Sequence, residues 1–159
     1  MMKILTREEA VQRINSLAGS NQPFLFITDY TSNTNYVLTE SEIDSSQILF
    51  SINGNTNASP STEYHKKIVL TKDEITFDQY KEQFDLVMKE LMAGNSYLLN
   101  LTCRTKVEFN CTMKDIFYST SARYRLWLKD QFIVYSPEIF IQIEDGKIYA
   151  HPMKGTIDA

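Results

Sequence analysis

The chain has 159 residues, of which 43% are hydrophobic and 12% aromatic, and its formal net charge is -4. This composition excludes a disordered or coiled-coil protein, and the length allows one domain with a sizeable core over residues 1–159. The basic residues are scattered, so no nucleic-acid surface is expected. No apolar run could span a membrane, and the charges of Arg7, Glu8 and Glu9 fall where an export signal would be apolar, so we expect a cytoplasmic protein.

The first part of the chain indicates one helix followed by short strands. Thr6 and Glu9 have the spacing of a capping box, and apolar residues then recur at helical intervals until Gly19. The apolar run over 23–30 predicts a buried strand. Further strands are expected over 35–39, 47–52 and 65–71, with a solvated, turn-rich loop over 53–63.

The strongest helix signal covers residues 76–93. Thr76 and Gln79 form a second capping box, and Gly94 follows as a C-terminal stop signal. Six apolar residues share one face of this helix, and we expect this stripe to belong to the core. They are Phe77, Tyr80, Phe84, Val87, Met88 and Leu91.

The rest of the chain indicates strands with one more helix between them. A long strand is expected over 96–109, a helix over 112–123 and a strand over 124–128. Residues 131–153 are expected to form strands again. Because strands come in runs with helices interspersed, we expect an α+β fold with a largely antiparallel sheet and packed helices.

The dipeptide Asp145-Gly146 between two alternating apolar runs is a strong hairpin signal, because a type I′ turn requires positive φ at both central residues. The turn fixes the register of the two strands. It pairs Glu144 with Lys147, Ile143 with Ile148, Ile141 with Ala150 and Ile139 with Pro152. One face of this hairpin is therefore wholly apolar.

Continued alternation places Lys154 on the apolar side of the hairpin. A lysine taken out of water has a lowered pKa, and its free amine can attack carbon. Glu138 lies opposite Met153 in this register and is either a simple ion-pair partner of the lysine or a general acid. Bringing both side chains into one pocket requires a bulge or kink. The alternative remains open that the strand ends by Met153 and Lys154 reaches solvent.

The histidines and cysteines lack the spacing of a metal or redox site. Cys103 and Cys111 do not form a Cys-x-x-Cys motif, so a structural role is expected. His65 and His151 have no cysteine or carboxylate at ligand spacing. Since Mg²⁺ needs several oxygen ligands and no cluster of acids fits, we predict no metal site in this chain.

Three motifs resemble those of the chorismate-utilising enzymes. GNSYLLNLT at 94–102 follows an amphipathic helix, SPEIF stands at 136–140, and HPMKGT stands at 151–156. In the family, a helix leads into G-[DE]-x-Y-Q-V-N-L, followed by S-P-E-x-F and P-I-[KA]-G-T. The chain departs from these patterns at Leu98, Leu99, Ile139 and Met153.

The lysine in the last motif resembles the aminodeoxychorismate synthase branch of this family (component I, the large subunit of para-aminobenzoate synthase), since anthranilate synthases have alanine there. The resemblance implies that the amine of Lys154 attacks C2 of chorismate and that Glu138 protonates the departing C4 hydroxyl. Ammonia then adds at C4 to give 4-amino-4-deoxychorismate, on the route to para-aminobenzoate and folate. Gly155 and Thr156 match positions that touch the substrate.

The resemblance also implies that residues 1–159 are the truncated N-terminal portion of an anthranilate-synthase-like fold. It implies a Mg²⁺ cofactor whose ligands are not in this chain, and a glutamine amidotransferase that supplies ammonia. Alone, the chain is expected to be inactive and to associate through exposed edges with itself or another chain. Two other readings are a chorismate converter of the anthranilate or isochorismate synthase type, and a non-catalytic binding module.

Overall fold

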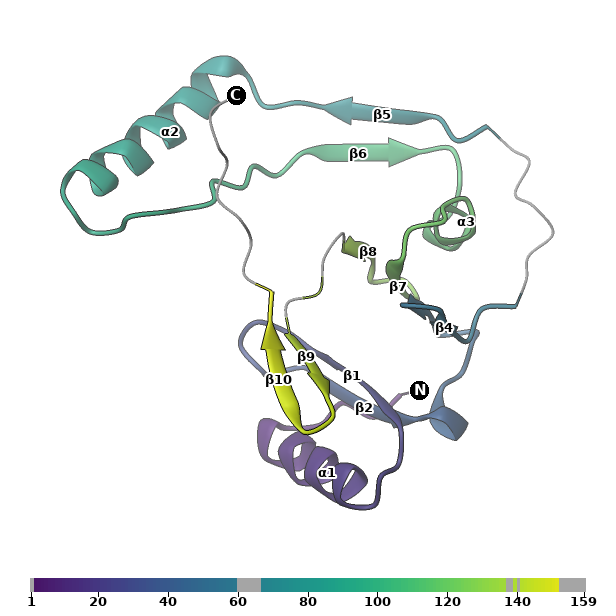
Figure 1. The fold of residues 1–159 in the computed structure, drawn as a ribbon. Helices are drawn as coiled ribbons and strands as arrows, with labels where there is room; N and C mark the ends of the chain where they lie inside the picture. The colour runs from purple at the N-terminus through teal and green to yellow at the C-terminus, as the bar shows by residue number, and fades with distance from the viewer. Residues whose placement is uncertain (1, 60–66, 137–138, 140, 152–159) are drawn as a thin grey trace.

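The structure, a computed structural model, describes residues 2–59, 67–136, 139 and 141–151. Helices and strands are mixed along the chain, and every strand pair in the described part is antiparallel (Figure 1). The expected α+β class is therefore confirmed. None of the helices formed by these residues is both long and apolar enough to cross a membrane.

A packed body, formed by residues 2–59 and 110–136, contains all the buried side chains of the described chain. Its centre is a sheet in the order β4-β3-β7-β8. The bounds are Ile48–Ile52 for β3, Asn55–Thr56 for β4, Tyr124–Leu128 for β7 and Phe132–Ser136 for β8. The short helix α3 (Met113–Tyr118) covers one face of this sheet, so the sheet forms the middle of a layered structure.

The other face of the sheet packs against a hairpin and a helix. The hairpin is formed by β1 (Phe24–Thr28) and β2 (Asn35–Thr39), followed by the 3₁₀ turn η1 (Glu40–Glu42). The outermost element is α1 (Arg7–Gly19), which packs on β2. Figure 1 shows these layers in order from α1 at the bottom to α3.

The burial of β2 on both sides follows from the alternation of side chains along a strand. Tyr36 and Leu38 pack with Ile48 and Leu128 of the central sheet, whereas Val37 between them packs with α1. All five residues of β2 are buried. The alternation in the central sheet is similar, and it directs Leu49, Trp127 and the α3 residue Phe117 into a separate cluster.

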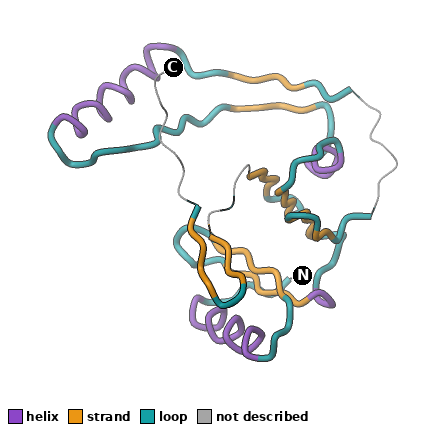
Figure 2. Tube along the Cα trace, viewed as in Figure 1, coloured by secondary structure: helices purple, strands orange, loops and turns teal. Residues whose placement is uncertain are grey.

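A second part of the structure, residues 67–109, extends from the packed body as an arm (Figures 1 and 2). It contains β5 (Leu70–Asp73), the helix α2 (Phe77–Met92) and β6 (Lys106–Phe109), with β5 and β6 paired. A separate hairpin is formed by β9 (Ile141–Glu144) and β10 (Lys147–Ala150). None of these five elements contains a buried residue.

The helix starts follow the capping signals of the sequence. In α2, the Thr76 hydroxyl accepts a hydrogen bond from the Gln79 amide at 3.3 Å, and Gln79 Oε1 accepts one from the Thr76 amide at 3.0 Å. In α1, the Glu9 carboxylate accepts a hydrogen bond from the Thr6 amide at 2.9 Å. These contacts satisfy backbone donors that the first turn of a helix leaves free, so both predicted capping boxes are confirmed.

Several predicted bounds are wrong. The long strand expected over 96–109 is a strand only at its end, in β6, because residues 96–105 have no partner strand among the described residues. The helix expected over 112–123 ends at Tyr118. Ser119 closes it by donating its amide to Asp115 O and Ile116 O, so the chain can turn into β7.

Two predictions of burial are also wrong. The apolar stripe of α2 was expected in the core, but Phe77 is 75% exposed and no residue of the helix is buried. The strand expected over 23–30 was expected to be buried, but β1 is buried only in part, and Phe26 is 57% exposed. Periodicity identified the apolar face in each case, whereas burial depends on which other element covers that face.

Candidate active site

The hairpin that leads to the predicted nucleophile has the expected geometry. Asp145 and Gly146 have φ values of 50° and 70°, as a type I′ turn requires. The predicted pairs over β9 and β10 are present, from Lys147 with Glu144 to Ala150 with Ile141. The pair expected between Ile139 and Pro152 lies partly outside the described residues.

The two faces of this hairpin differ in chemistry. The apolar face carries Ile143 and Ile148, which are 70% and 73% exposed, so none of the described residues covers it. On the opposite face Gln142 Nε2 donates a hydrogen bond to Glu144 Oε2 at 2.9 Å. An element that covered the isoleucine face would create the dry environment in which a lysine amine loses its charge.

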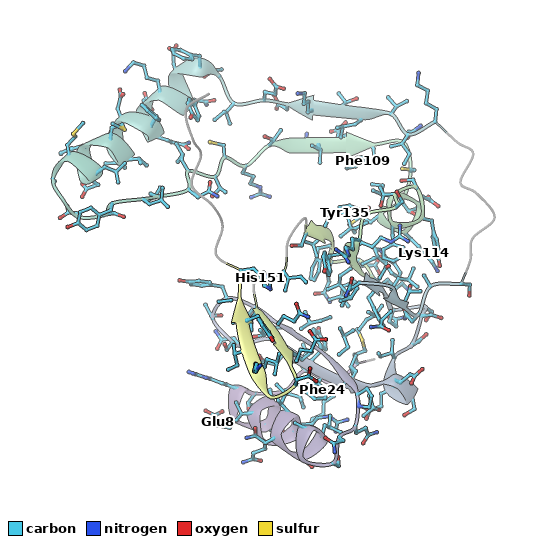
Figure 3. The ribbon with its side chains drawn as sticks, in the orientation of Figure 1. Glu8, Phe24, Phe109, Lys114, Tyr135 and His151 are labelled. Carbon is cyan, nitrogen blue, oxygen red and sulfur yellow. The ribbon has the colours of Figure 1, made fainter. Side chains whose placement is uncertain are left out.

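The predicted site residues lie outside the described part of the chain. This holds for the two catalytic residues, Lys154 and Glu138, and for the two substrate-binding residues, Gly155 and Thr156. Their roles therefore stay predictions. His151, which directly follows β10, is exposed (Figure 3).

The described residues do not form a metal site. They contain no group of three histidine, cysteine, aspartate or glutamate side chains placed to hold an ion. Cys103 and Cys111 are free thiols, and both are partly buried. Cys103 Sγ donates to Gln83 Oε1 at 3.5 Å. The prediction that residues 1–159 hold no metal stays a prediction.

Two hollows of the described surface lie beside the helices α1 and α2. A groove of about 150 Å³ between α1 and the β1–β2 hairpin is lined by Val11, Ile14 and Phe26, and its only ionisable side chains are those of Arg7 and Tyr36. A larger, open hollow of about 610 Å³ lies beside the start of α2, next to Tyr80 and Cys103. Lys72 and Glu74 also line the second hollow, where their side chains form an ion pair with each other, and the Cys103 thiol there donates to Gln83.

A charged pair that the sequence did not reveal links α1 to η1. Arg13 Nη2 donates to both carboxylate oxygens of Glu42, at 2.7 and 2.5 Å, and Arg13 Nε donates to Val37 O at 3.0 Å. Glu42 also accepts the Thr39 amide at 2.9 Å. The Thr39 hydrogen bond and then Arg13 lower the pKa of Glu42 to about 2. These contacts hold the backbone in place, so the pair is structural.

A polar link of the same kind holds α3 on the central sheet. Tyr135 on β8 donates its hydroxyl to Ile116 O at 3.0 Å, and Figure 3 shows this side chain beside α3. Arg125 Nη1 donates to Phe117 O at 3.3 Å, and its guanidinium lies 4.8 Å from the Phe117 ring centre. Both donors satisfy carbonyls at the C-terminal end of the helix. They contribute to the fold and lie away from the β9–β10 hairpin.

Comparison with known proteins identifies the family. The family model described as chorismate binding enzyme matches residues 7–159. The chain is 39% identical over 150 residues to an uncharacterized PabA-like protein of Pasteurella multocida (strain Pm70) and 37% identical over 154 residues to an uncharacterized PabA-like protein of Haemophilus influenzae (strain ATCC 51907 / DSM 11121 / KW20 / Rd). These matches cover 94% and 97% of the chain but 46% and 47% of the relatives.

The chain thus spans less than half the length of these curated relatives. No solved structure matches it significantly. The family match extends over both the packed body and the β9–β10 hairpin, and it includes the three motifs that resemble chorismate-utilising enzymes. The chain therefore belongs to the family of chorismate binding enzymes.

Proposed function

We propose that this chain is part of an enzyme that aminates chorismate at C4 to give 4-amino-4-deoxychorismate. The observation that carries the proposal is a lysine, Lys154, directly before Gly155 and Thr156, in a chain that matches the chorismate binding enzymes over residues 7–159. A lysine offers an amine nucleophile at this position. An alanine, as in anthranilate synthases, could not.

The proposed reaction has two displacement steps. The free amine of Lys154 forms a bond to C2 of chorismate while the C4–O bond breaks, and Glu138 donates the proton with which the hydroxyl leaves as water. Ammonia then bonds to C4 as the C2–N bond to Lys154 breaks and its electron pair returns to the lysine nitrogen, which regenerates the free amine. The one proton that the added ammonia loses returns to Glu138 and restores the acid. A covalent adduct divides one difficult substitution into two easier ones.

The first step requires an uncharged lysine near neutral pH. Burial disfavours the ammonium form, because a charge leaves water for a medium of low dielectric constant. The apolar side chains of Ile141, Ile143 and Ile148 on the preceding hairpin support such a setting once another element covers them. Glu138 is proposed as the general acid, and Gly155 and Thr156 as substrate contacts.

The proposal includes two components beyond this chain. One is a glutamine amidotransferase subunit or domain that supplies the ammonia. The other is Mg²⁺, which in this setting would neutralise substrate carboxylates. The described residues do not fit a magnesium site by themselves, since they lack a cluster of oxygen ligands. We therefore place the Mg²⁺ ligands outside this chain and derive no step through the metal.

The test uses the protein at its natural length, as its own cells make it. It is incubated with chorismate, Mg²⁺ and ammonia, and the products are identified by mass and chromatography. We expect 4-amino-4-deoxychorismate from the wild type, a loss of at least about 1,000-fold in Lys154→Ala, and wild-type turnover in Lys147→Ala, because Lys147 is an exposed lysine of the same hairpin.

Two results would contradict the proposal. Unchanged turnover in Lys154→Ala would exclude a covalent adduct on this lysine as a step of the reaction. Anthranilate or isochorismate as the product of the wild type would assign the chain to another reaction of the same family, with the family membership unaffected.

A further inference from the structure

The arm formed by residues 67–109 carries apolar side chains in the pattern of a buried element, but these side chains are largely exposed. On α2 the apolar stripe contains Phe77, Tyr80 and Phe84, which are 75%, 41% and 42% exposed. A stripe at this spacing in a globular protein normally faces a core. The packed body supplies no such cover, because no residue of α2 is buried.

The two strands of the arm repeat this pattern. Leu70 pairs with Phe109 and Lys72 with Val107, so one face of the β5–β6 pair carries three apolar side chains, Leu70, Val107 and Phe109, together with Lys72. These three side chains are 50%, 44% and 41% exposed. The opposite face carries polar and charged residues such as Thr71 and Glu108. The strand pair is thus largely amphipathic, and its apolar side chains are only about half covered by the described residues.

The arm is built to hold its shape at the point where it leaves the packed body. Asn110 Oδ1 accepts the Val69 amide at 2.9 Å, and Asn110 Nδ2 donates to Lys67 O at 3.1 Å. Beyond this clamp, however, a helix of 16 residues and a sheet of two strands are each marginal in water without tertiary packing. The arm therefore needs a partner for stability.

We infer that the apolar stripe of α2 and the apolar face of β5–β6 form a docking surface for the remaining part of a chorismate-binding chain. Each of the two relatives has more than half of its length outside the match, so both contain polypeptide available for this role. The outer edges of β5 and β6 are unpaired in the described chain and can accept further strands.

The charges of the arm argue against a membrane as the occupant. Helices that lie on membranes are rich in lysine and arginine on their polar face. The polar face of α2 instead has an excess of acidic residues, with Asp78, Glu82, Asp85 and Glu90 against Lys81 and Lys89. An anionic lipid surface would repel this helix, whereas a polypeptide with its own apolar face would not.

The inference rests on family membership and not on the amination reaction. The test co-expresses residues 1–159 with a complementing segment, namely the part of the Pasteurella multocida relative that lies outside the match. Copurification is measured together with hydrogen exchange of the α2 amides. We expect a stoichiometric complex and α2 exchange at least about 100-fold slower than in the chain alone.

Two matched variants probe the contact. Phe84→Glu places a charge in the stripe, whereas Leu86→Glu makes a similar change on the opposite face, where Leu86 is 60% exposed. We expect Phe84→Glu to weaken the complex by about 100-fold or more and Leu86→Glu to leave it unchanged. Trp127 fluorescence checks that the packed body is folded in both variants, because neither position contacts the buried clusters.

Three outcomes would overturn the inference. The first is no copurification, or α2 exchange that the segment does not slow. The second is an equal effect of the two variants. The third is a chain that forms a dimer on its own with protected α2 amides, which would make a second copy of this chain the occupant. None of these outcomes depends on product formation, so a failure of the amination proposal remains distinguishable.

Discussion

Replacement of phenylalanine by leucine at two positions separates the packed body from the arm. Phe117 on α3 is fully buried at 0% exposure and packs with Leu49 and Trp127. Phe84 on α2 is 42% exposed. The chemical change is the same at both sites, so a difference in the free energy of unfolding reports the packing around each ring.

The expected cost is about 1–1.5 kcal/mol for Phe117→Leu, which removes part of a close-packed ring and leaves a small cavity. Phe84→Leu in residues 1–159 should stay within about 0.5 kcal/mol, as surface substitutions do. The assay is urea unfolding followed by the fluorescence of Trp127, the single tryptophan of the sequence, which is 5% exposed. Equal costs at the two sites would refute the division into packed body and arm.

Two further predictions concern a charged pair and a turn. Glu42 has a folded pKa of about 2 against an ordinary 4.5, so its contribution is complete above about pH 4.5 and is lost as the pH falls toward 2. Because its side chain is 45% exposed, that contribution is at most about 1 kcal/mol, and acid titration of unfolding should be flatter in Glu42→Gln. An unchanged acid profile in Glu42→Gln would contradict the lowered pKa of Glu42. Gly146 has a φ of 70°, so Gly146→Ala should destabilise the β9–β10 hairpin by about 1 kcal/mol and speed hydrogen exchange of its amides. Asp145→Asn should have neither effect, because asparagine is also favoured in this turn. Equal exchange in both variants would contradict the turn assignment.

Local signals in the sequence predicted local structure well. The capping boxes at Thr6 and Thr76 and the turn at Asp145-Gly146 each depend on residues that are close in sequence, and all three are confirmed. The register of the β9–β10 hairpin follows from its turn, so it was predicted as well. The dipeptide Asn53-Gly54 carries the same kind of signal, with φ values of 49° and 92°, but it was assigned to a loop and the β3–β4 hairpin was missed.

Features that depend on distant parts of the chain could not be predicted in this way. Periodicity identified the stripe of α2 but not its exposure, because the covering element is not encoded in the helix itself. The ion pair of Arg13 and Glu42 joins residues far apart in sequence, and no local sequence pattern predicts it. The same applies to the contact between Tyr135 and Ile116 that holds α3.

The site was predicted from motifs rather than from geometry. Lys154, Glu138, Gly155 and Thr156 were identified by resemblance, and the family match over residues 7–159 supports the resemblance as a whole. The roles of the individual residues depend on their spatial relation.

The most direct test of the central claim is a mass measurement of the lysine adduct. The protein at its natural length is mixed with chorismate and Mg²⁺ without ammonia, quenched in acid and digested for peptide mapping. The account predicts a mass increase equal to chorismate less one water on the peptide that contains Lys154, and its loss when ammonia is added. Formation of 4-amino-4-deoxychorismate with no such adduct, or with the adduct on another residue, would contradict it.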